Sequence, residues 1–255
     1  MSTSEAGRSR ALSKVPEVTL LFWVIKVAAT TLGETAGDAV SMSMDLGYLV
    51  GTALFALLFA IAVGVQIAAR KFHPLIYWVT IIATTTVGTT LADFSTRSLG
   101  IGYAGGSCLL LALLLASLFT WYMTLGSVAV ETVSTTQAEV FYWVTIMFSQ
   151  TLGTALGDWT ADSAGFGYLG SALIFGLLLA LLALAYWKTS LSRTLLFWAA
   201  FILTRPLGAV LGDFLDKPHD HGGLEFSRYG ATLVLLLFMG ACMVLFPQRA
   251  AAKQH

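Results

Sequence analysis

The chain has 255 residues, of which 57% are hydrophobic and only 11% are charged, and its formal net charge is zero. Soluble domains carry about 25% charged residues, so this composition, with a mean hydropathy of +0.79, excludes an ordinary soluble domain and predicts a bilayer protein. We expect lipid as a partner and no nucleic acid. Residues 1–15 are polar, with no apolar run before Pro16, so we expect no cleavable signal peptide.

In chain order, the sequence predicts an all-α integral membrane protein with eight transmembrane helices of about 20 residues each. They are placed at 18–40, 47–69, 74–96, 102–124, 139–161, 167–187, 194–215 and 229–247. The expected organisation is a disordered N-terminus at 1–15, two repeats over 16–126, a linker at 127–138, two further repeats over 139–247 and a tail at 248–255. Thr136 and Glu139 are expected to form a capping box at the fifth helix.

The odd-numbered predicted helices share a motif of Trp, then Gly ten residues on, then Asp five further on. Its four copies are Trp23, Gly33, Asp38; Trp78, Gly88, Asp93; Trp143, Gly153, Asp158; and Trp198, Gly208, Asp213. The even-numbered helices have almost no polar residues and read as an outer, lipid-facing wall. Each repeat holds two spans, so the motif helices all cross in one direction. We therefore expect four parallel two-helix hairpins with the motif helices inside.

Lys and Arg residues near the predicted span ends indicate the orientation. Nine lie at the termini and the even-to-odd loops, against three on the opposite side. The sequence therefore predicts cytoplasmic termini and a location in the cell inner (plasma) membrane. Each motif Trp is then expected at the inner interface, with its Asp about 22 Å further along the helix axis.

In each motif helix, polar side chains stand at positions four residues apart, which places them on one helix face. The four stripes are Lys26, Thr30, Glu34, Asp38; Ile81, Thr85, Thr89, Asp93; Ile146, Gln150, Thr154, Asp158; and Phe201, Arg205, Ala209, Asp213. Unsatisfied polar groups cost several kcal/mol in lipid, so we expect the stripes to face inward and to form one polar core.

Carboxylates outnumber bases in this predicted core. Lys26 and Arg205 neutralise two of the five acids, which leaves a formal charge of minus three, and Arg97 is a further partner because it lies four residues after Asp93. The structural alternative is that the acids only pair with buried cations, or that the aspartates cap short segments that follow them.

The residue types in the core favour a hard cation. Carboxylate and hydroxyl oxygens suit Mn²⁺ or Mg²⁺, and no Cys or His lies at the same level. We expect no permanently bound cofactor and a cation site formed by Glu34, Asp38, Asp93, Asp158 and Asp213, with Thr89, Gln150 and Thr154. Buried carboxylates also bind protons, so proton coupling fits the same site. Asp216, His219, Asp220 and His221 are candidates for an accessory metal site on an outer loop, or are solvated bystanders.

Several functions are compatible with an acidic core in lipid. The sequence favours a transporter of a small divalent cation such as Mn²⁺, and it leaves open a cation channel or a transporter of an organic cation held by aromatic rings. An enzyme is not expected, because the chain has no HExxH, GxSxG or phosphate-binding motif.

The motif segments GETAGD, GTTLAD, GTALGD and GAVLGD carry a family resemblance. The chain resembles a bacterial family of multi-pass membrane proteins defined by a four-fold repeat of unknown function, from Pro16 to Phe246. The resemblance implies an integral membrane protein and suggests a transporter, without naming a substrate.

Overall fold

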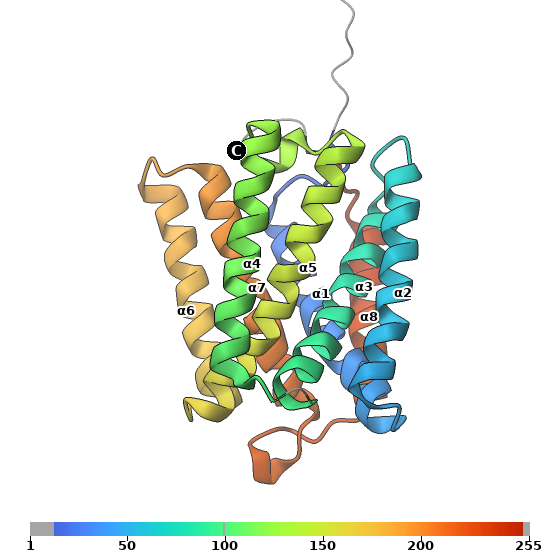
Figure 1. The fold of residues 1–255 in the computed structure, drawn as a ribbon, viewed down its shortest axis with the longest axis vertical. Helices are drawn as coiled ribbons and strands as arrows, with labels where there is room; N and C mark the ends of the chain where they lie inside the picture. Colours follow the sequence, from blue (N-terminus) through green and yellow to red (C-terminus); the bar gives the residue numbers. More distant parts are fainter. Residues whose placement is uncertain (1–12, 99, 252–255) are drawn as a thin grey trace, which may run out of the picture.

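The chain folds into an all-helical bundle, seen in a computed structural model that describes residues 13–98 and 100–251 (Figure 1). Within these ranges there is no β-sheet, and the β-pairing is limited to one isolated bridge. The eight long helices are α1 (Leu20–Asp38), α2 (Gly47–Ala68), α3 (Pro74–Asp93), α4 (Gly102–Leu125), α5 (Thr136–Asp158), α6 (Gly167–Lys188), α7 (Arg193–Asp216) and α8 (Arg228–Leu245). They match the predicted helices closely.

The motif helices lie inside the bundle and the other helices outside, as predicted. In the most apolar stretch of α2 only 6% of residues are buried, against 67% in the corresponding stretch of α3. The outer wall presents large apolar side chains, such as Leu173, Leu177 and Leu181 of α6, which are 61%, 65% and 60% exposed. Among the described residues, six helices are long and apolar enough to cross a membrane: α2, α3, α4, α6, α7 and α8.

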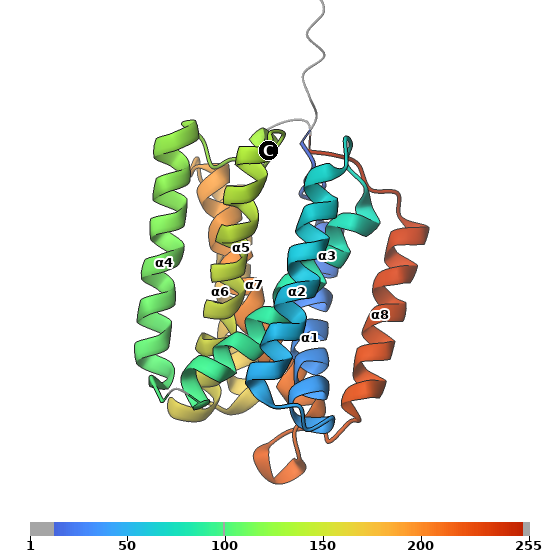
Figure 2. The ribbon, with the colours of Figure 1, turned by 45° about the vertical axis from the view of Figure 1, so that its right-hand side comes forward.

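The motif helices form a closed ring in which α1 packs on α3, α3 on α5, α5 on α7 and α7 on α1. Each outer helix packs on the motif helix of the following repeat, so α2 lies on α3, α4 on α5 and α6 on α7, while α8 closes the cycle on α1 (Figure 2). This differs from the predicted hairpins. A π-helix and a turn follow α1, and this connection carries α2 away from α1 and onto α3.

The glycine of each motif marks the closest approach between neighbouring motif helices. Each motif glycine lies against the second residue of the polar stripe on the next motif helix around the ring. A Cβ added to the glycine would fall 2.0–3.0 Å from the nearest atom of that residue. The four pairs are Gly33 with Thr85, Gly88 with Gln150, Gly153 with Arg205, and Gly208 with Thr30. Only glycine permits this spacing, so the motif glycines set the diameter of the ring.

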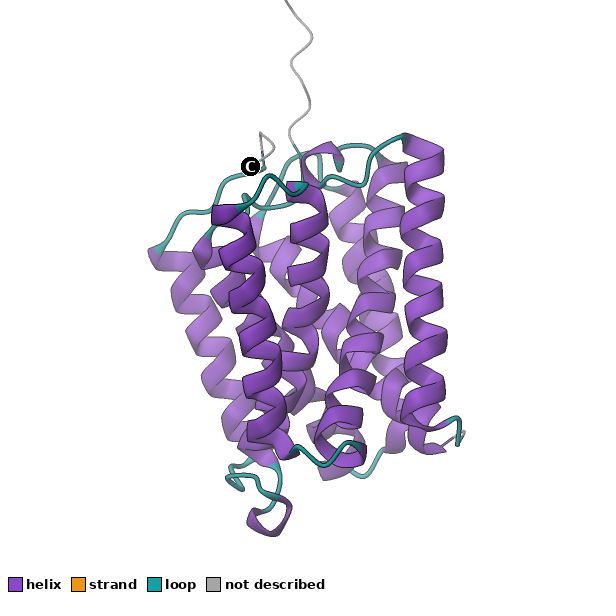
Figure 3. Cartoon of the chain, turned by 90° about the vertical axis from the view of Figure 1, so that its left-hand side faces the viewer, coloured by secondary structure: helices purple, strands orange, loops and turns teal. Residues whose placement is uncertain are grey.

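Both described ends of the chain lie on the same face of the bundle, opposite the loop between α7 and α8 (Figure 1), and Figure 3 shows the helices running between these two faces. Pro16 and Ala250 form an antiparallel bridge. Residues 13 and 15 of the predicted N-terminal tail are buried here, whereas residues 1–12 and 252–255 lie outside the described chain.

The predicted capping box at α5 is wrong by one residue. Thr135 is the cap, and its hydroxyl accepts a hydrogen bond from Ala138 N. The carboxylate of Glu139 instead binds Lys14 Nζ at 2.7 Å, because the N-terminal segment runs across this end of the bundle. Glu139 therefore holds the N-terminal segment in place and does not close a capping box.

The motif tryptophans pack into an aromatic layer near the terminal face, although the sequence predicted them at a lipid interface. Trp78, Trp143 and Trp198 are at most 4% exposed, and only Trp23 is partly exposed. Their polar atoms have partners inside the protein: Trp78 Nε1 donates to Gln248 Oε1 at 2.8 Å, and Trp198 Nε1 donates to the Val128 carbonyl at 2.9 Å. The polar core therefore lies between this layer and the opposite face.

Candidate acidic site

The motif aspartate ends the regular helix in the first three repeats. A five-residue π-helix follows each of them: Ala39–Ser43, Phe94–Ser98 and Trp159–Ser163. Asp38 and Asp158 make no side-chain capping bond to these segments, so the capping alternative is wrong for both. The π-helices widen the backbone where the carboxylates lie, a feature common at functional sites.

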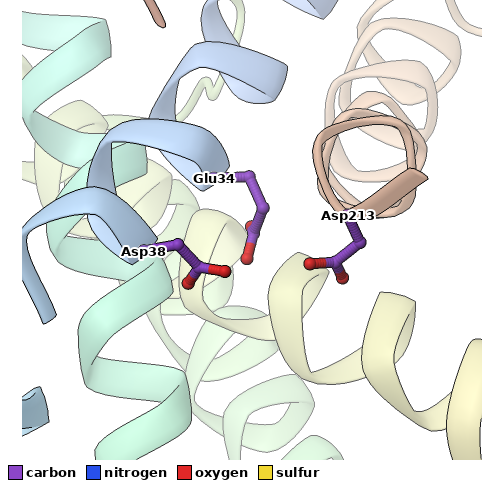
Figure 4. A group of neighbouring side chains, drawn as sticks. All are labelled: Glu34, Asp38 and Asp213. Carbon is purple, nitrogen blue, oxygen red and sulfur yellow. The ribbon is translucent and has the colours of Figure 1, made fainter. Parts of the chain in front are cut away.

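Three acidic side chains converge at one point in the core. Glu34 and Asp38 project from α1 at a spacing of four residues, and Asp213 projects toward them from α7 (Figure 4). Each has a carboxylate oxygen within 4.8 Å of the others, and all three residues are at most 3% exposed. Among the described residues, no other group of three or more His, Cys, Asp or Glu residues meets this spacing. We call these three residues the acidic cluster.

Asp93 and Asp158 form a separate arrangement around Arg97. Arg97 Nε binds Asp93 Oδ1 at 2.8 Å, and Arg97 Nη2 binds Asp158 Oδ2 at 3.4 Å. The five predicted acids therefore bind their cations in two groups, with Asp93 and Asp158 on Arg97 and the other three in the acidic cluster. Asp93 and Asp158 are each 3% exposed, so neither lines an open, solvent-accessible cavity.

Lys217 is the main residue that the sequence prediction missed. Its Nζ contacts the carboxylate of Asp38 and lies 3.1 Å from Asp213 Oδ1 and 4.0 Å from Asp216 Oδ1. Burial disfavours its charge, but these three carboxylates outweigh burial and raise the pKa of Lys217 well above its usual value. The spacing was a usable signal, because Lys217 follows Asp213 by four residues, just as Arg97 follows Asp93.

Arg228, at the start of α8, is a second missed partner. Its Nε lies 3.2 Å from Asp216 Oδ2 and 3.9 Å from Asp38 Oδ2. Asp216 is therefore part of the buried network and is not a ligand on the outer loop as expected. No motif marks Arg228, because α8 reaches α1 only through the closing of the ring.

Arg205 lies where all four motif helices meet. Its Nη2 donates to Glu34 Oε2 at 2.9 Å on α1, to Thr89 Oγ1 at 2.6 Å on α3 and to Thr154 Oγ1 at 2.5 Å on α5. Its Nη1 donates to the Thr30 carbonyl at 3.3 Å. The predicted pairing of Arg205 with an acid is confirmed, and the guanidinium also occupies the axis of the ring.

Lys26 is buried, and no carboxylate among the described residues pairs with it. The prediction that it neutralises a core acid is wrong, because it lies two turns before Glu34 and reaches the level of the aromatic layer. Its Nζ is 3.5 Å from Thr204 Oγ1 and 4.0 Å from the centre of the Phe201 ring. Its side chain is fully buried.

The uncharged candidates have different surroundings. Thr89 Oγ1 lies 3.3 Å from Glu34 Oε2, so it is beside the acidic cluster. Thr154 Oγ1 instead accepts from Arg205 Nη2 and donates to the Gln150 carbonyl of its own helix. Gln150 is fully buried, and both atoms of its amide lack a hydrogen-bond partner among the described residues.

The histidine loop lies apart from the acidic cluster. His219, Asp220 and His221 have side chains that are 71%, 79% and 70% exposed. His219 is 3.9 Å from Glu225, and His221 is 4.0 Å from Asp220. They do not join Asp216, which points into the protein, so the four residues do not form one accessory site.

The complete network has other members than the predicted one but a similar charge. Six carboxylates face four cationic side chains, which leaves a formal surplus of two negative charges, the value that the sequence count gives once Arg97 is included. The acids are Glu34, Asp38, Asp93, Asp158, Asp213 and Asp216, and the bases are Arg97, Arg205, Lys217 and Arg228. Asp38 Oδ1 has no hydrogen-bond partner among the described residues.

Comparison with known proteins identifies the repeat. The model of a family described as Repeat of Unknown Function (DUF347) matches four segments, at residues 21–72, 76–127, 141–192 and 196–247. Each segment contains one motif helix and the outer helix that follows it. No curated protein and no solved structure matches the chain.

Proposed function

The chain belongs to this repeat family, and from that premise we propose that it is a membrane transporter of a small cation, with eight spans and a binding site at Glu34, Asp38 and Asp213. The observation that carries the proposal is the convergence of three buried carboxylates within 4.8 Å in a bundle with an apolar exterior. Ionisable residues inside a membrane are costly, and they commonly mark an ion pathway.

The ligands favour a hard divalent ion such as Mn²⁺ or Mg²⁺. The acidic cluster offers carboxylate oxygens, with the hydroxyl of Thr89 beside Glu34. Oxygen donors of this kind bind Mg²⁺, Ca²⁺ and Mn²⁺ in preference to thiophilic metals. An organic cation is less well supported, because most of the buried aromatic rings, such as those of Trp78 and Trp143, belong to the cluster near the terminal face.

Arg205 favours a carrier over an open channel. Its guanidinium bonds to three other motif helices and so separates the acidic cluster from the aromatic layer. A cation that crosses the protein must pass this point, which requires the contact between Arg205 and Glu34 to break. We propose alternating access in which breaking this pair opens the terminal side, with protons as candidate coupling ions. We also propose that both termini are cytoplasmic and that the protein lies in the cell inner membrane, which the distribution of Lys and Arg supports.

Flux through proteoliposomes tests the proposal. Purified protein is reconstituted, and Mn²⁺ entry is followed with an internal metal-sensitive dye, with and without a voltage set by a K⁺ gradient. We expect saturable Mn²⁺ uptake that is lost in Asp38→Asn and Asp213→Asn. Asp220→Asn is the matched control, because it is the same substitution on a side chain that is 79% exposed.

Each outcome has a defined meaning. Wild-type flux no greater than that of empty liposomes, or full flux in both cluster variants, contradicts the proposal. Flux that increases with concentration without saturating and follows the voltage identifies a channel instead of a carrier.

A further inference from the structure

Lys217 occupies the position that a bound cation would take. Its ammonium group contacts Asp38 and lies 3.1 Å from Asp213, so it bridges two of the three members of the acidic cluster. Asp38 Oδ1 stays buried without a hydrogen bond. The acidic cluster therefore holds a positive charge that belongs to the protein, and it keeps a further buried oxygen free.

The repeats provide an internal comparison. The position four residues after the motif aspartate holds Met42, Arg97, Asp162 and Lys217 in turn. The two cations make equivalent bridges, since each binds its own aspartate and the aspartate of the next repeat around the ring. Arg97 makes this bridge with two nitrogens of a planar guanidinium. Lys217 makes it with one compact ammonium group, which is the easier of the two to exchange for an ion.

The backbone holds Lys217 at the edge of the site. Glu225 N donates to the Lys217 carbonyl at 2.9 Å, and Leu224 N donates to the Phe214 carbonyl at 2.7 Å, so the loop folds back onto the end of α7. A Cβ on Gly223 would fall 2.1 Å from the Lys217 carbonyl oxygen, so glycine is required for this turn. The backbone is fixed, while the side chain, 13% exposed, reaches inward from the loop face.

The end of α7 also offers a position for the displaced ammonium group. Asp216 Oδ1 lies 4.0 Å from Lys217 Nζ and has no hydrogen-bond partner among the described residues. A rotation of the side chain toward Asp216 would free Asp38 and Asp213 without exposing an unpaired charge.

We infer that Lys217 is a tethered competitor that a substrate cation must displace, and that it makes the acidic cluster selective for divalent over monovalent ions. The inference rests on the proposed function. When a monovalent ion displaces the Lys217 ammonium group, the charge beside the carboxylates is unchanged and little electrostatic energy is gained. A divalent ion adds one positive charge beside the carboxylates and so binds more strongly. Lys217 thus rejects Na⁺ and K⁺ by charge, at a site whose oxygen ligands would otherwise accept them.

The test compares metal binding in variants of the full-length protein. Isothermal titration with Mn²⁺, and thermal stabilisation by Mn²⁺ and by K⁺, are measured for wild type, Lys217→Met and Lys217→Gln. We expect both variants to bind Mn²⁺ about tenfold more tightly and to gain stabilisation by K⁺. Lys217→Arg should bind Mn²⁺ more weakly than wild type, since a guanidinium is harder to displace. Gel filtration identifies any variant that does not fold. Lys217→Gln also keeps a polar group at position 217.

Two further variants make the result specific. Lys71→Met removes an exposed lysine from the loop between α2 and α3 and should leave the binding of Mn²⁺ and of K⁺ unchanged. Arg97→Met removes the equivalent bridge and should not tighten Mn²⁺ binding. The inference is overturned if the folded Lys217→Met and Lys217→Gln variants bind Mn²⁺ no more tightly than wild type and are not stabilised by K⁺. If Asp38→Asn also binds Mn²⁺ normally, the proposed function fails instead.

Discussion

Gly208 of α7 and Thr30 of α1 join the last motif helix to the first. A Cβ on Gly208 would lie 2.0 Å from Thr30 Oγ1 and 2.5 Å from Thr30 Cβ. Thr30 Oγ1 also lies within hydrogen-bond distance, 3.2 Å, of the Thr204 carbonyl on α7. This contact closes a ring that would otherwise be an open row of helices, and it brings Asp213 to the two acids of α1.

Gly208→Ala should therefore destabilise the protein. The added methyl group would overlap Thr30 Cβ and the Thr30 backbone, and a change of the Thr30 rotamer does not move these atoms. We therefore expect the free energy of unfolding to fall by about 3 kcal/mol, the upper end of the usual cost of overpacking. Thermal unfolding in detergent measures it. Gly176→Ala is the matched control, because a Cβ at Gly176 of α6 meets no atom within 4 Å. A Gly208→Ala protein as stable as Gly176→Ala would show that the ring does not need this close approach.

Arg205→Met should be strongly destabilising. It leaves Glu34 as a buried charge without its partner, and such changes cost about 3–5 kcal/mol. The double variant Arg205→Met with Glu34→Gln removes the unpaired charge and should recover part of the loss. The four proteins form a double-mutant cycle, measured by the denaturant or thermal midpoint. Additive effects of the two substitutions would contradict a direct interaction between these side chains.

Lys26→Met should stabilise the protein. Lys26 is fully buried and contacts no carboxylate among the described residues, so its amino group is poorly compensated. Methionine has a similar length and no charge, and we expect a gain of about 1 kcal/mol or more. Lys26→Arg is the comparison, since it keeps the charge and adds bulk and should lose stability. A clear loss of stability in Lys26→Met would indicate a partner that the polar contacts do not reveal.

The sequence predicts the helices and their inside-outside arrangement because both depend on local patterns. Polar residues at every fourth position define one face of each motif helix, and α6 has no such face. The partner of each outer helix is not local. α2 lies on α3 because of the π-helix after Asp38, and no turn signal in the sequence distinguishes a π-helix from the end of an α-helix.

The sequence predicted the residue types of the site and two of its charge partners, Arg97 and Arg205, but it missed Lys217. The four motif aspartates look equivalent in the sequence, yet Asp93 and Asp158 share Arg97, while Asp38 and Asp213 share Lys217. Charge counting alone cannot assign these partners, because they depend on which helices are neighbours in the ring. Lys26 was misassigned for the same reason: its distance from Glu34 along α1 puts it at the level of Phe201.

Mn²⁺ titration of the four motif variants, Asp38→Asn, Asp93→Asn, Asp158→Asn and Asp213→Asn, tests the central claim most directly. Each variant carries the same substitution at the same position of its repeat, so differences in affinity report the pairing around the ring. We expect Asp38→Asn and Asp213→Asn to weaken Mn²⁺ binding by at least about tenfold, while Asp93→Asn and Asp158→Asn lose stability and keep most of the affinity. An equal loss in all four variants, or no loss in Asp38→Asn and Asp213→Asn, would contradict a cation site at Glu34, Asp38 and Asp213.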